Sequence, residues 1–83
     1  MKHAQHWLVG YDPKTEQESF ELAIPSEKLG IVGTLVRFDD DDPNGIGSYE
    51  LTNIQAIRIA NLLRAEYQLP QGLEFFLEAH SDV

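Results

Sequence analysis

The chain has 83 residues, which is the size of one domain, so we treat residues 1–83 as a single domain. It contains no cysteine, which excludes disulfides, zinc–thiolate centres, iron–sulfur clusters and thiol nucleophiles. Fourteen acidic against six basic residues leave a formal net charge of −8, which argues against nucleic acid or an anionic membrane as the direct partner.

Two strand patterns open the chain and predict an antiparallel hairpin. Residues 5–11 and 19–24 both alternate with a period of two. Between them, Asp12 and Pro13 begin a turn, because Asp bonds to nearby backbone and Pro presets φ. Trp7, Val9 and Tyr11 share one face of the first strand, His6, Leu8 and Gly10 share the other, and Phe20, Leu22 and Ile24 point inward from the second.

The period changes after the hairpin. Ser26 is a suitable N-cap, and apolar residues follow it at helical spacing between Leu29 and Val36. Gly30 and Gly33 weaken the helix by up to about 1 kcal/mol each, and a third strand through residues 31–38 is the alternative. We predict the helix.

A second helix has the clearest signal in the chain. Thr52 is its N-cap, and residues 53–67 are rich in strong helix formers with one apolar stripe. Pro70 and Gly72 follow where a helix cannot continue. Residues 73–79 then return to a period of two, which predicts a last strand. Leu73, Phe75, Leu77 and Ala79 face one way on this strand, and Glu74, Phe76 and Glu78 face the other.

The order β-β-α-α-β predicts an α+β fold of two layers. We expect a three-stranded antiparallel sheet with both helices on one face. The opposite sheet face is then open and carries Glu21, Glu74, Phe76 and Glu78. An aromatic side chain between carboxylates is the composition of a protein-binding anchor with a charged rim. The alternative is that Phe76 is only a partly covered sheet residue.

Residues 39–48 form an acidic loop. Its segment 40–45, with the sequence DDDPNG, matches the opening of a calcium-binding loop. The bidentate Glu expected at position twelve is missing, because Leu51 stands there and Glu50 is one residue early. We expect a solvated loop without metal.

Catalytic motifs are not found in this sequence. It has no glycine-rich phosphate loop, no H-E-x-x-H and no G-x-S-x-G. A thin two-layer domain also has little depth for a buried carboxylate pair. His3 and His6 are three apart, so on a strand they point to opposite faces and fit a metal site poorly with His80. We therefore expect a protein that is not an enzyme and has no cofactor.

Four short segments carry a resemblance. Gly10-Tyr11-Asp12, Asp41-Asp42-Pro43, Tyr49-Glu50-Leu51-Thr52 and Phe76-Leu77-Glu78 resemble a family of small bacterial proteins. In size, acidity and lack of cysteine the chain is also similar to the immunity proteins of contact-dependent growth inhibition and of nuclease colicins. That resemblance implies a protein that binds a cognate basic toxin domain, such as a nuclease, and masks its active or substrate-binding surface.

The expected partner is therefore a basic toxin protein, and neither nucleic acid nor a membrane. The N-terminal residues do not resemble a secretory signal, and no apolar run approaches the ~20 residues of a membrane span, so we expect a cytoplasmic location. Two alternatives are a calcium-binding helix-loop-helix-like module and a housekeeping protein-interaction domain. The predicted partner-binding residues are Asp39, Asp40, Asp41, Asp42, Tyr49, Glu50, Glu21, Glu74, Phe76 and Glu78.

Overall fold

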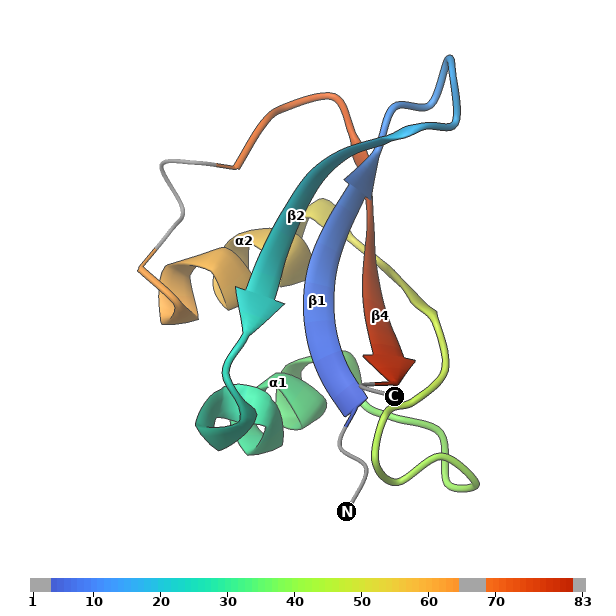
Figure 1. Ribbon diagram of the computed structural model, residues 1–83. Helices are drawn as coiled ribbons and strands as arrows, with labels where there is room; N and C mark the ends of the chain where they lie inside the picture. The colour runs from blue at the N-terminus through green and yellow to red at the C-terminus, as the bar shows by residue number, and fades with distance from the viewer. Residues whose placement is uncertain (1–3, 65–68, 82–83) are drawn as a thin grey trace.

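The computed structural model describes residues 4–64 and 69–81. Within them a four-stranded antiparallel sheet lies against two helices, in a small α+β fold (Figure 1). The elements in chain order are β1 (Ala4–Tyr11), β2 (Glu18–Ile24), the short 3₁₀ helix η1 (Ser26–Lys28), α1 (Leu29–Val36), β3 (Tyr49–Leu51), α2 (Asn53–Leu62) and β4 (Glu74–Ser81).

The prediction of a three-stranded sheet was wrong. The strand order is β2-β1-β4-β3, and the unexpected strand β3 pairs with β4 through Tyr49 opposite Leu77 and Leu51 opposite Phe75. Three residues are too few to show a period of two. β3 is instead specified by its pairing with β4, which is distant in sequence.

The first helix was predicted correctly, although its start was not. Residues 29–36 are helical, but η1 precedes them, with Pro25 at the N-cap position and no side-chain cap from Ser26. The helix ends where Arg37 adopts a left-handed conformation with φ 63°. Gly33 allows the close approach of Phe38, since a Cβ at Gly33 would lie 3.1 Å from a carbon of its ring.

The second helix begins as predicted and ends earlier. The Thr52 hydroxyl accepts from the Gln55 backbone N–H, and the Gln55 side chain accepts from the Thr52 backbone N–H, which completes a capping box. Leu63 is the C-cap, and Arg64 turns to a φ of 57°. The predicted helical residues 65–67 lie outside the described residues. Within the described part of the chain, no helix is long and apolar enough to cross a membrane.

The hydrophobic core lies between the sheet and the helices, which cover the same sheet face (Figure 1). His6 is buried within this layer, and its Nε2 lies 3.1 Å from the Asn44 carbonyl oxygen and 3.0 Å from that of Gly45. These contacts tie the acidic loop to β1. The buried apolar side chains are Leu8, Ile24, Val32, Leu51, Ala56, Ile59, Ala60, Phe75 and Leu77.

Candidate functional site

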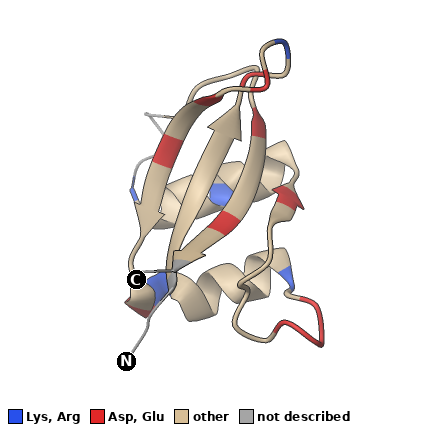
Figure 2. Cartoon of the chain, turned by 45° about the vertical axis from the view of Figure 1, so that its right-hand side comes forward, with Lys and Arg blue, Asp and Glu red and all other residues tan. Residues whose placement is uncertain are grey.

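The sheet face opposite the helices is the first candidate surface, and we call it the open face. The strand period and the pairing register place alternate residues of all four strands on it. Figure 2 shows acidic residues on these strands, and none of the four strands contains Lys or Arg. The open face consists of Gln5, Trp7, Val9, Tyr11, Glu18, Glu21, Ala23, Glu50, Glu74, Phe76, Glu78 and His80.

Tyr11 and Phe76 form the centre of the open face. Their rings pack edge to face, with centroids 5.5 Å apart. The Tyr11 hydroxyl donates to Glu78 Oε2 over 2.8 Å. Val9 lies directly opposite Phe76 and is only 1% exposed. These contacts order the centre of the face without any partner.

The electrostatics of the open face are dominated by carboxylates. The hydrogen bond to Glu78, helped by partial desolvation and by the negative charge of that carboxylate, raises the pKa of Tyr11 to about 12. Partial desolvation, followed by the charge and hydrogen bond of neighbouring Glu21, raises the pKa of Glu18. His80 Nε2 lies 3.6 Å from Glu78 Oε1. Among the described residues, no other basic group lies within ion-pair distance of a carboxylate. The face therefore has a largely uncompensated negative field.

A hollow of about 330 Å³ runs over β4 on the open face, and we call it the trough. Phe76 and Tyr11 supply its apolar surface. By the register, Glu74 stands opposite Tyr11 near the β1–β2 turn, and Glu78 lies toward the other end of β4. The lining residues are Tyr11, Asp12, Glu16, Ser48, Glu74, Phe76 and Glu78.

The acidic loop forms a second, separate cluster. The Asp42 carboxylate accepts from the Tyr49 hydroxyl over 2.6 Å and from the backbone N–H groups of Ile46 and Gly47, both over 2.9 Å. The bond from Tyr49, followed by the two backbone bonds, lowers the pKa of Asp42, and the same side-chain bond raises the pKa of Tyr49. The Tyr49 hydroxyl also accepts from the Asp39 backbone N–H. Asp42 and Tyr49 therefore hold the loop in shape.

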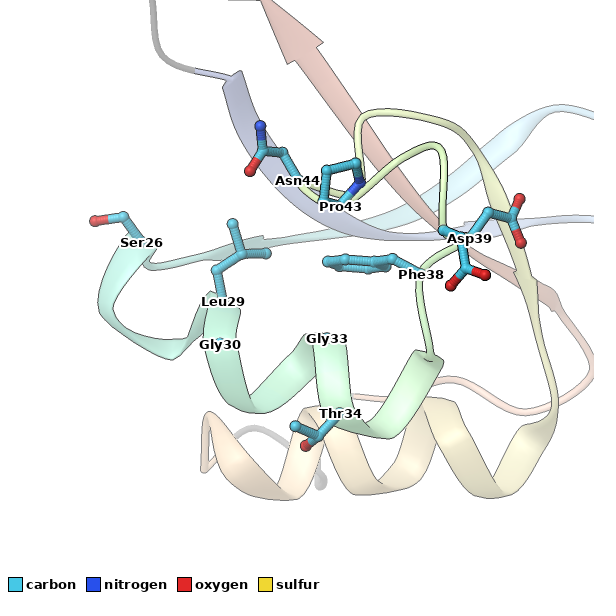
Figure 3. Close-up of a pocket in the computed structure, with 10 residues that line it drawn as sticks. Ser26, Leu29, Gly30, Gly33, Thr34, Phe38, Asp39, Pro43 and Asn44 are labelled. Carbon is cyan, nitrogen blue, oxygen red and sulfur yellow. The ribbon is translucent and has the colours of Figure 1, made fainter.

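A hollow of about 610 Å³ lies between α1 and this loop. Figure 3 shows the Phe38 ring between α1 and Pro43, with Leu29 nearby. Asp39 and Asp40 belong to its lining. The loop continues into β3 and not directly into a helix, which differs from the helix-loop-helix layout of the calcium-binding alternative. Among residues 4–64 and 69–81, no group of three or more His, Asp or Glu side chains is placed to hold a metal ion.

One family model matches most of the chain. Residues 5–78 match the model of a family described as Domain of unknown function (DUF7683). The chain belongs to this family. The matched range includes every residue of the open face except His80. No curated protein and no solved structure matches the chain.

The structure divides the predicted partner-binding residues into two groups. Glu21, Glu50, Glu74, Phe76 and Glu78 come together on the open face, whereas Asp39, Asp40, Asp41, Asp42 and Tyr49 lie in or beside the acidic loop.

Sequence reasoning missed several contributors to the open face, namely Gln5, Trp7, Val9, Tyr11, Glu18, Ala23 and His80. The alternation in β1 could have indicated the four that lie on that strand. Both faces of that strand contain apolar residues, however, and the sequence does not say which face meets the helices.

Proposed function

We propose that this protein is a non-catalytic, cytoplasmic immunity protein that binds a cognate basic toxin domain, such as a nuclease, through the open face. The observation that carries this proposal is the composition of that face. Five glutamates surround a preformed centre of Tyr11 and Phe76, and no strand supplies Lys or Arg. This combination favours a protein partner of positive charge.

Charge complementarity explains how such a partner is recognised. A nuclease binds phosphate with Lys and Arg, so its substrate cleft has a positive field that the open face complements. Long-range attraction of this kind accelerates association and is weakened by salt. Masking the cleft would block access of nucleic acid to the toxin.

Tight binding also needs a desolvated anchor, and the centre of the open face supplies one. Aromatic residues are enriched among interface hot spots. The rings of Tyr11 and Phe76 already pack together, and the Tyr11 hydroxyl is fixed by Glu78. An anchor ordered before binding loses less conformational freedom on association.

The proposal is tested with the protein encoded beside this one. We expect it to be toxic when expressed alone, harmless when co-expressed with this protein, and co-purified with it. A harmless neighbour, or one that does not co-purify, would overturn the immunity proposal.

Two charge-matched variants locate the binding surface. The first replaces Glu21, Glu74 and Glu78 with Gln, and the second replaces Asp39, Asp40 and Asp41 with Asn, so each removes three negative charges. We expect the first variant to slow association more strongly and to flatten its salt dependence. A larger effect of the loop variant would show that the acidic loop, and not the open face, is the main contact.

A third variant tests the anchor. Phe76→Ala is expected to weaken the complex by on the order of 2 kcal/mol, mainly through faster dissociation. Surface plasmon resonance measures both rates. Unchanged dissociation would remove Phe76 from the binding site.

A further inference from the structure

The trough on the open face has the chemistry to take one particular side chain. We propose that it binds an arginine of the basic partner, with the guanidinium packed against the rings of Tyr11 and Phe76 and hydrogen-bonded to Glu78. This inference rests on the proposed function, since it names the group of the partner that the open face recognises.

The size and shape of the trough suit a single side chain. Its volume of about 330 Å³ is at the lower end of the 300–1,000 Å³ typical of small-molecule pockets. The trough is an open feature of an unpartnered sheet face, so a side chain projecting from another protein can enter it directly. The edge-to-face packing of Tyr11 and Phe76 leaves ring surface within its lining.

Charge complementarity requires the occupant to be a cation. Four carboxylates line the trough, from Asp12, Glu16, Glu74 and Glu78, and its lining contains no Lys or Arg. Glu78 is the most suitable acceptor, because its side chain is only 18% exposed. A hydrogen bond to a carboxylate with little access to water is stronger than one at an open surface.

An organic cation fits better than a metal ion. The carboxylates of the trough are not gathered closely enough to coordinate an ion, since no described group of His, Asp and Glu is placed to hold one. The apolar share of the lining from Tyr11 and Phe76 also has no role in coordinating a metal that prefers oxygen ligands.

Arginine also fits the trough better than lysine, because the lining combines aromatic rings with carboxylates. A guanidinium is planar and weakly hydrated, stacks on aromatic rings and donates two hydrogen bonds side by side to a carboxylate. The ammonium of lysine is a compact, strongly hydrated point charge. The Tyr11 hydroxyl bond to Oε2 fixes the orientation of Glu78. Its Oε1 lies 3.6 Å from His80 Nε2, too far for a hydrogen bond to that ring, and can accept from a guanidinium.

The test uses three capped tripeptides that differ in one side chain, Gly-Arg-Gly, Gly-Lys-Gly and Gly-citrulline-Gly. Citrulline has nearly the shape of arginine without its charge. Each is titrated into the full-length, ¹⁵N-labelled protein and followed by NMR. We expect the arginine peptide to shift the backbone amides around Tyr11, Phe76 and Glu78, with affinity at least about tenfold higher than that of the lysine peptide. Equal binding of lysine or citrulline, or shifts confined to residues 39–48, would overturn the proposal.

Matched variants assign the binding to the trough. Glu78→Gln is nearly isosteric and can still accept the Tyr11 hydrogen bond, so we expect it to fold and to lose most of the arginine binding. Glu21→Gln removes one charge from the same face outside the trough lining and is expected to bind almost normally. Equal losses in the two variants would show a general charge effect and refute specific binding of arginine in the trough.

The outcome can be separated from that of the proposed function. Arginine binding in the trough by a protein that fails to neutralise its neighbour would refute the immunity proposal alone. A neutralising complex whose affinity is unchanged in Glu78→Gln and Phe76→Leu would refute only the binding of an arginine in the trough.

Discussion

The hydrogen bond between Tyr11 and Glu78 joins residues 67 positions apart and can be removed by a single substitution, Tyr11→Phe. This variant loses the hydroxyl and retains the ring that packs against Phe76. A rise of the Tyr11 pKa from 10.0 to about 12 corresponds to roughly 2.7 kcal/mol. Solvent screening at this partly exposed site reduces the expected contribution to about 1 kcal/mol.

The contribution of this hydrogen bond to stability depends on pH. The pKa of Tyr11 is higher in the folded protein than in the unfolded chain, so the stabilisation is complete below pH 10 and is lost as the pH rises to about 12. At pH 8 we therefore expect Tyr11→Phe to lower the free energy of unfolding by about 1 kcal/mol. Near pH 12 the two proteins should have nearly equal stability.

Urea denaturation followed by the fluorescence of Trp7, the single tryptophan, measures both free energies. Other groups that titrate at high pH affect the two proteins alike and cancel in the difference between them. Tyr11 and Tyr49 both have a raised pKa, so absorbance titration should show the loss of the Tyr11 transition in the variant while that of Tyr49 remains. Equal stability at pH 8, or a difference that persists at pH 12, would contradict the assignment of this bond.

Three further predictions concern the glycines and the acidic loop. Gly45→Ala should destabilise the fold by roughly 2–4 kcal/mol, because Gly45 has a φ of 64° and an added Cβ would overlap the Phe38 ring. Gly30→Ala has no atom near its added Cβ and should stabilise the fold by about 0.5–1 kcal/mol. Thermal melts compare the two variants. Asp42 has a lowered pKa, so its stabilisation is present above the ordinary value and is lost as acid protonates it; Asp42→Asn should flatten the loss of stability between pH 5 and pH 2 in urea titrations. Calcium at about 1 mM should shift the melting temperature by less than ~1 °C, since a ligand at 100 times its Kd would add ~2.7 kcal/mol; a clear rise that disappears in Asp40→Ala would contradict this.

Local sequence signals determined the elements that carry their own pattern. The alternation in residues 19–24 and 73–79 specified two strands. Thr52 with Gln55 specified the start of α2 through a capping box that involves neighbouring residues only. The apolar spacing around Val32 specified α1 despite its two glycines, because burial of that face outweighs a propensity difference of about 1 kcal/mol per glycine.

Tertiary contacts decided the rest. β3 has only three residues, and its pairing with β4 makes it a strand. The interior strand β1 has apolar residues on both faces, and Val9 is buried on the open face opposite Phe76, so the orientation of β1 depends on neighbours on either side. The composition of the candidate site follows from that orientation: Tyr11 meets Phe76 and Glu78 only after β1 and β4 pair in register. Such contacts join residues far apart in sequence, and a local hydrophobic period contains no information about them.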